Sequence, residues 1–118
     1  MRTDTDAAFA ASAFSAFPLN LPATELVRLV QTGEVRASEL ARTSLQRVAA
    51  LDTRINAFQH VLGHASLQAA QGLEQRGDLK TLPLAGLPIA IKDNLAIKGT
   101  PTRCGSSAVS TAPAAADH

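Results

Sequence analysis

The sequence predicts an α/β fold that is incomplete within its 118 residues. Apolar residues recur at helical spacing through the first two thirds of the chain. The period then changes, and Pro83, Gly86 and Pro88 exclude a helix in the segment that follows. The next apolar run, 89–91, predicts a short buried strand, yet the chain offers few partners for its edges. Helices followed by an isolated buried strand form an unfinished α/β pattern.

Two helices are expected after an irregular, alanine-rich lead-in over residues 1–21. The first has Thr24 as its N-cap and ends at Gly33. The second is longer and begins after Ser38, a second N-cap candidate. Its apolar stripe is formed by residues three or four positions apart: Leu40, Ser44, Val48, Leu51 and Ile55.

A third helix is predicted from His64 to Arg76, with Gly77 ending it. Its Gly72 weakens the helix by about 1 kcal/mol relative to alanine. The side chains expected to point inward are Leu67, Ala70 and Leu73. The preceding segment, 56–61, mixes apolar and polar residues and fits either a short strand or an extended link. The stretch after residue 92 is rich in glycine, serine and threonine and predicts a loop.

Composition excludes several classes of protein. The 11 basic and 10 acidic side chains are mixed along the chain, so the basic stripe of a nucleic-acid binder is missing. The apolar stretch 7–19 follows Asp4 and Asp6, where a secretory or mitochondrial leader needs positive charge. No run has the length of a membrane span. The single cysteine, Cys104, cannot form an internal disulfide and fits a reducing compartment, so we expect a cytoplasmic protein.

Lys92 is the residue with the most chemical interest. It follows the apolar run 87–91 and precedes Asp93 and Asn94, whose short polar side chains can bind an ammonium group or form a tight turn. A lysine desolvated at a strand end gives up its proton more readily and can act as a base. An ordinary exposed lysine at a strand end is the alternative.

The sequence also resembles a known family. Residues 83–94, P-L-A-G-L-P-I-A-I-K-D-N, match the lysine motif P-L-x-G-x-P-x-x-x-K-D-N of the amidase signature family at every fixed position. Residues 99–106 are similar to that family's G-x-x-T-T-x-G-S, with Arg103 in place of the second threonine. The resemblance covers about residues 22–116. It implies that 22–118 is the N-terminal part of an amidase domain, with the helices and first strand or strands of its mixed-sheet fold.

The resemblance also implies a mechanism. In that family a serine attacks an amide carbonyl, and a second serine on a cis peptide passes the proton to the lysine. Lys92 would be this base, Asp93 and Asn94 would fix the lysine and its turn, and Ser106 would support the relay. No metal or cofactor is implied, and the substrate of the full-length enzyme would be a small linear amide. Because the two serines are expected beyond His118, we expect the chain to be an inactive fragment by itself.

Two other functions are open. One is a fragment of the A subunit of glutamyl-tRNA amidotransferase, in which the same chemistry frees ammonia from glutamine for a partner subunit. Residues 98–99 and 104–106 favour that protein, whereas 101–103 favour stand-alone bacterial amidases. The other is a non-catalytic helical interaction module from a degenerate reading frame. Its partner would be a second copy of the chain.

Three weaker signals do not predict sites. His60 and His64 lie four residues apart, but no glutamate lies between them, Gly63 interrupts a helix there and no third ligand is apparent. Cys104 has no positioned histidine and is expected to be a loop or core thiol. The segment 99–105 lacks the pattern of a phosphate-binding loop.

Overall fold

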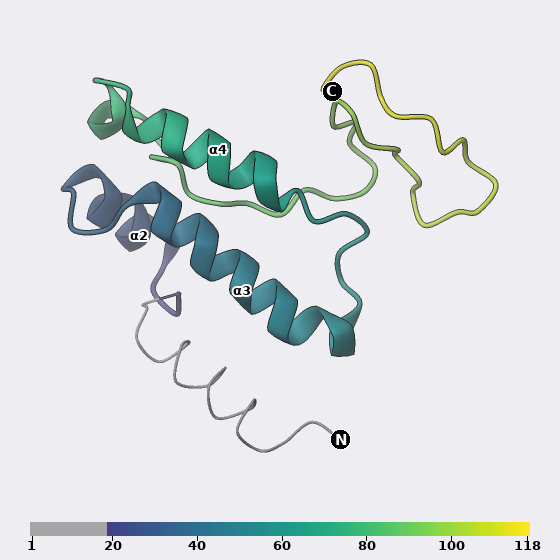
Figure 1. Cartoon of the computed structure of the whole chain (residues 1–118), viewed down its shortest axis with the longest axis horizontal. Coiled ribbons are helices and arrows are strands. Elements are labelled where there is room, and N and C mark those ends of the chain that lie inside the picture. Colours follow the sequence, from purple (N-terminus) through teal and green to yellow (C-terminus); the bar gives the residue numbers. More distant parts are fainter. Residues whose placement is uncertain (1–18) are drawn as a thin grey trace. The chain divides into compact units, whose positions relative to one another are not determined.

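The computed structural model describes residues 19–118, which divide into two units (Figure 1). The first, the helical unit, comprises residues 19–57 and 62–88. The second, the loop unit, comprises residues 58–61 and 89–118. Most of the predicted lead-in lies outside the described residues, so the boundary after residue 21 stays a prediction.

The helical unit contains the three predicted helices. They are α2 (Ala23–Gln31), α3 (Ala37–Ile55) and α4 (Gly63–Glu74), followed by a 3₁₀ turn, η1 (Leu79–Thr81). Helices α3 and α4 lie side by side and run in opposite directions, as in a helical hairpin (Figure 1). The predicted helix boundaries were therefore accurate to within two residues.

The predicted N-caps were wrong, and at the start of α3 carboxylates, not hydroxyls, accept hydrogen bonds from the backbone amides. Thr24 and Ser38 lie inside their helices, behind the N-cap residues Pro22 and Arg36. The Ser38 amide donates a hydrogen bond to Glu74 Oε1 at 2.7 Å. A helix start leaves its first amides unsatisfied and carries partial positive charge, so a carboxylate is a favourable acceptor there. A distant acidic residue therefore satisfies the start of α3.

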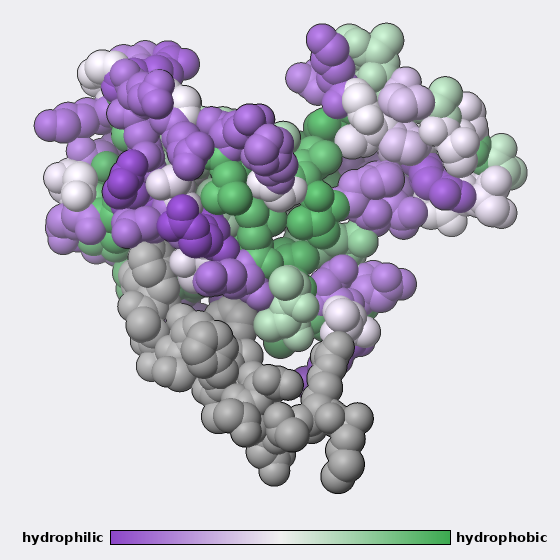
Figure 2. Space-filling model, in the orientation of Figure 1, coloured by the Kyte–Doolittle hydropathy of each residue, from purple (hydrophilic) through white to green (hydrophobic). Residues whose placement is uncertain are grey.

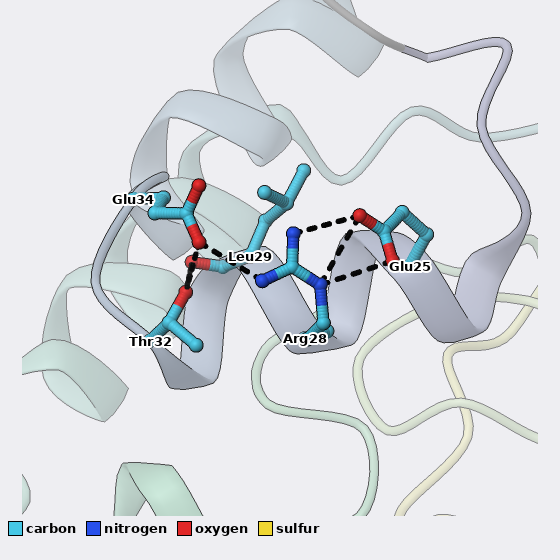
Figure 3. A network of polar contacts seen from close by, with 5 residues as sticks. All are labelled: Glu25, Arg28, Leu29, Thr32 and Glu34. Atoms are coloured by element: carbon cyan, nitrogen blue, oxygen red, sulfur yellow. Dashed lines mark hydrogen bonds and ion pairs between the residues drawn. The ribbon is translucent and has the colours of Figure 1, made fainter.

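The predicted helix end at Gly33 is confirmed. Gly33 has φ +78°, and its amide donates to the Val30 carbonyl at 3.1 Å. Beside it, Arg28 on α2 bridges Glu25 at 2.7 Å and Glu34 at 2.9 Å, and the Thr32 hydroxyl donates to Glu34 (Figure 3). Solvent screens this exposed network, so it contributes little to stability.

The core of the helical unit is small and rich in alanine. Among the described residues, its buried apolar members are Leu26, Val30, Ala37, Leu40, Ala41, Ala70 and Ala85. Leu67 packs against this cluster, so the inward face predicted for α4 is confirmed at Leu67 and Ala70. The predicted stripe of α3 holds except at its end: Leu40 is fully buried, Ser44, Val48 and Leu51 are half-buried, and Ile55 is 64% exposed.

The predicted strand at 89–91 is wrong for this chain. Residues 19–118 contain no β-strand, and Ile89 and Ile91 are 65% and 47% exposed. A strand requires a neighbour for its backbone groups, and none of the described segments pairs with 89–91. The segment 56–61 has no strand either and is a link. The α/β expectation is thus met in its helices and not in its sheet.

Apolar side chains consequently lie at the surface. Figure 2 shows them in green on the face that it draws, between hydrophilic residues. In the described part of the chain the most exposed large ones are Ile55, Val61, Leu84 and Ile89. No helix within residues 19–118 has the length and apolarity needed to cross a membrane.

Candidate functional site

The first half of the lysine motif, 83–88, forms a tight turn in the helical unit. The Leu87 amide donates to the Leu84 carbonyl at 2.8 Å, and the two central residues, Ala85 and Gly86, have φ +43° and +75°. Positive φ at both central positions gives a turn of the type I′ class. Ala85 is only 1% exposed, so this turn is part of the core.

Gly86 is required by space as well as by φ. A Cβ atom built on Gly86 would lie 2.8 Å from the Ala37 Cβ at the start of α3 and 3.3 Å from the Leu73 Cδ1 on α4. The turn is also held from α2, because Gln31 Nε2 donates to the Leu82 carbonyl at 3.0 Å. The first half of the motif therefore serves the packing of the three helices, a role that the sequence analysis did not predict.

The second half of the motif, 89–94, belongs to the loop unit and is open. Lys92 is exposed, and its carbonyl accepts hydrogen bonds from the amides of Asn94 at 2.8 Å and Leu95 at 3.1 Å. The backbone thus turns directly after the lysine, as the short polar residues predict. The lysine does not emerge from a buried element in this chain, because residues 89–91 form no strand and are exposed.

Asp93 connects the lysine turn to the segment that follows. Its carbonyl accepts from the Cys104 amide at 3.0 Å, and its Oδ1 accepts from the Arg103 amide at 3.1 Å. These amides begin a second type I′ turn, in which the Ser106 amide donates to the Arg103 carbonyl at 2.9 Å. Cys104 and Gly105 at its centre have φ +52° and +70°.

The structure therefore brings the four predicted site residues, Lys92, Asp93, Asn94 and Ser106, into one set connected through the backbone. Lys92 and Asp93 share a turn, and Asp93 binds the turn that contains Ser106. Asn94 is exposed in the same turn as the lysine. Ser106 is half-buried, and its Oγ accepts from the Ala108 amide at 3.1 Å. The aspartate at the turn was the only sequence signal for these contacts, because Arg103 lies ten positions after Asp93 and sequence spacing does not indicate such a pairing.

The base of this loop is closed by a separate set of bonds that sequence analysis also missed. The Gly99 amide donates to the Ala114 carbonyl at 2.9 Å, and the Ala114 amide donates to the Thr100 carbonyl at 2.9 Å. The Lys98 amide donates to Asp117 Oδ1 at 2.8 Å. Residues 100–114 are therefore a loop held at its ends, and Asp93 holds it at a further point, Arg103 and Cys104.

The weaker candidates, His60, His64 and Cys104, have exposed side chains. His60 and His64 are both exposed, with His64 in the first turn of α4. Within residues 19–118, no three histidine, cysteine or acidic side chains come together as metal ligands would. Cys104 is an exposed free thiol in a loop, one of the two environments expected for it.

Comparisons with known proteins agree on one family. A family model described as Amidase matches residues 39–118. The chain is 43% identical over 89 residues to the A subunit of the glutamyl-tRNA(Gln) amidotransferase of Salinispora arenicola, covering 74% of this chain and 18% of that protein. The corresponding A subunit of Deinococcus radiodurans is 45% identical over 86 residues, covering 71% and 17%. The chain thus spans about a fifth of the length of these relatives.

A solved structure is similar as well. It is described as a vestigial protein complex that reveals the evolutionary origins of an s-triazine catabolic enzyme. It superposes with a TM-score of 0.75 at 29% identity, covering 82% of this chain and 22% of the solved chain. The part of the solved chain that resembles this fold is therefore about a fifth of a much longer protein.

Proposed function

Since the chain belongs to the amidase family, we propose that it supplies the lysine of an amide-cleaving site whose serines come from elsewhere. Lys92 is the general base, Asp93 and Asn94 fix its turn, and Ser106 supports the relay of the proton. The observation that carries the proposal is the exposure of Lys92 on a hydrogen-bonded turn within the matched residues. An exposed amine on an ordered turn is available to groups outside this chain.

The proposed reaction is hydrolysis of a C–N bond without a metal or cofactor. A serine oxygen attacks the amide carbonyl carbon, and its proton passes through a second serine to the Lys92 amine. The same proton is then given to the departing nitrogen, and water releases the acid from the serine. This chain contributes the base. Ser106 and Ser107 are not the nucleophile, since Gly105-Ser106-Ser107-Ala108 lacks the glycines that flank the family's serine segment.

Two substrates are compatible with this chemistry. The first is a small linear amide cleaved by a stand-alone amidase. The second is glutamine, whose ammonia would be passed to the partner of an amidotransferase complex. The names of the relatives from Salinispora arenicola and Deinococcus radiodurans favour the second. The alternative to both enzyme proposals is a helical module that binds a second copy of the chain and has no catalytic activity.

The test joins residues 1–118 to the part of the Salinispora arenicola relative that follows its matched segment. Release of ammonia is measured with glutamine and with a simple linear amide, for this protein and for the chain alone. We expect no turnover from the chain alone. In the joined protein Lys92→Ala should lower kcat by about 10²- to 10⁴-fold, the usual contribution of a general base.

Lys98→Ala is the matched control, because Lys98 is a second exposed lysine of the loop unit. It should leave kcat unchanged. Turnover by the chain alone that disappears in Lys92→Ala would show that the serines are present in this chain. It would overturn the proposal that they come from elsewhere. A joined protein that folds and is active regardless of residue 92 would remove Lys92 from the mechanism and leave the interaction module.

A further inference from the structure

We propose that Asp93 is a positioning residue that fastens the Arg103–Ser106 turn to the Lys92 turn. Its importance for catalysis rests on the proposed function. The attachment itself is a property of this chain and can be measured without any reaction. Asp93 would then determine where Ser106 and its neighbours lie relative to the lysine.

The first argument is the pattern of contacts. Asp93 accepts from two consecutive amides, with its carbonyl from Cys104 and with its carboxylate from Arg103. A contact through the main chain alone would place the segment but allow it to rotate. The second contact, through the side chain, fixes its direction. Hydrogen bonds to a carboxylate are also stronger than those between neutral groups.

The second argument is the conformation of the turn that Asp93 holds. Cys104 has φ +52°, in the left-handed region that residues with a Cβ atom avoid. A short turn with such a residue at its centre is not favoured by the local chain. Contacts from outside the turn must therefore stabilise it, and the two bonds from Asp93 meet it at Arg103 and Cys104.

The third argument is the position of the contact within the loop. The loop 100–114 is already closed at its base by the bonds among Gly99, Thr100 and Ala114. Closing the base does not decide where the Arg103–Ser106 turn within the loop lies. Asp93 binds this turn at Arg103 and Cys104, and Asp93 is the immediate neighbour of the lysine. One residue thus links the proposed base to the half-buried Ser106.

The first experiment uses the chain of 118 residues. Amide hydrogen exchange is measured residue by residue by NMR. We expect Asp93→Ala to speed exchange at the Arg103 and Cys104 amides by about ten-fold or more. Asp93→Asn should recover part of the protection, because it keeps an oxygen acceptor.

Asp117→Ala is the matched control. Asp117 also accepts an amide hydrogen bond through its side chain, from Lys98. Its removal should speed exchange at Lys98 and leave Arg103 within about two-fold of the unmodified chain. If Asp93→Ala leaves exchange at Arg103 unchanged, or if Asp117→Ala changes it equally, Asp93 does not fasten the turn and the proposal fails.

The second experiment separates positioning from stability in the joined protein described above. A positioning role predicts that Asp93→Ala lowers kcat with little change in KM and that Asp93→Asn restores part of kcat. Unchanged kcat in Asp93→Ala, with activity still dependent on Lys92, overturns the positioning role and leaves the proposed function intact. Loss of protection at Arg103 in a joined protein without Lys92-dependent turnover has the opposite meaning: the attachment stands and the proposed function fails.

Discussion

The two halves of the lysine motif each form a hydrogen-bonded turn but differ in their packing. Residues 83–88 belong to the helical unit, where Ala85 is 1% exposed and Gly86 lies against Ala37. Residues 89–94 belong to the loop unit, where Ile89 is 65% exposed and Lys92 is open. Twelve consecutive residues that match one family pattern are therefore divided between a packed region and an unpacked one.

The residue types in the two halves of the motif are therefore explained by packing to different extents. In its first half the residue types follow from sterics within this chain, because no side chain fits at Gly86. In its second half no packing contact among the described residues accounts for the apolar residues Ile89 and Ile91, which are 65% and 47% exposed. An apolar run such as 89–91 is explained by burial, and burial occurs here only if another segment covers it.

We expect the largest effect on stability from a substitution at Gly86. Gly86→Ala should lower the free energy of unfolding of the helical unit by roughly 2 to 4 kcal/mol, from the positive φ and from the overlap with Ala37 together. Unfolding by urea, followed by circular dichroism, measures the change.

Gly33→Ala is the control for that experiment. Gly33 lies in the same unit with nearly the same φ, +78°, but no atom lies within 4 Å of its added Cβ. It should cost only about 1 to 2 kcal/mol, the penalty of the left-handed conformation. Equal losses in the two variants would show that the motif glycine is needed for φ alone and that the turn does not pack on α3.

The next effect concerns Glu74, which joins the two helices that the first half of the motif contacts. Burial raises the pKa of the Glu74 carboxyl, but hydrogen bonds from Ser38 and from Arg36 lower it by more, so it lies below its ordinary value of 4.5. The ionised form is thus bound more favourably in the folded state. Its contribution is complete above about pH 4.5 and is lost as the pH falls through the folded-state pKa.

Glu74→Gln should therefore lower the free energy of unfolding by about 1 kcal/mol at pH 7 and by less as the pH falls below 4.5. Asp78→Asn is the control, because its ion pair with Arg76 is exposed on both sides. Urea unfolding midpoints of both variants, measured at several pH values, test this pH dependence. A Gln variant whose deficit stays constant down to about pH 3 would show that the charge of Glu74 does not hold α3 to α4.

The parts of the fold that could be predicted are those determined by neighbours in sequence. The period of apolar residues indicated α2, α3 and α4, and Gly33 indicated the end of a helix. The carboxylate that accepts the Ser38 amide at the start of α3 could not be predicted, since Glu74 lies 36 residues from Ser38. The strand at 89–91 failed for the same reason, because pairing depends on a distant segment.

The candidate site follows the same division. Lys92, Asp93 and Asn94 were found because they are consecutive and match a motif. The bond from Arg103 to Asp93 spans ten residues and depends on the left-handed conformation of Cys104, which its residue type does not favour. A sequence pattern therefore located the proposed base but not the contacts that would position it.

A smaller effect is expected on the open side of the comparison. Ile91→Ser should change the free energy of unfolding by less than about 0.5 kcal/mol, because Ile91 is already 47% exposed. It should raise the concentration at which the chain begins to aggregate, since an exposed apolar run promotes association. Urea unfolding and light scattering measure the two quantities. A loss of about 2 kcal/mol would place Ile91 in a core and remove the contrast between the halves.

The smallest effect is expected at the proposed base itself. Lys92→Ala should leave the unfolding midpoint of the chain of 118 residues unchanged, because an exposed lysine contributes little to stability. Lys98→Ala, at another exposed lysine of the loop unit, sets the level of no effect. In the joined protein the same substitution can have a different effect on stability. If the added segments bury residues 89–91, Lys92 becomes the end of a covered strand, and removing a buried cation relieves a desolvation cost. A rise in stability on Lys92→Ala that occurs only in the joined protein would therefore show that the second half of the motif acquires its environment from outside this chain.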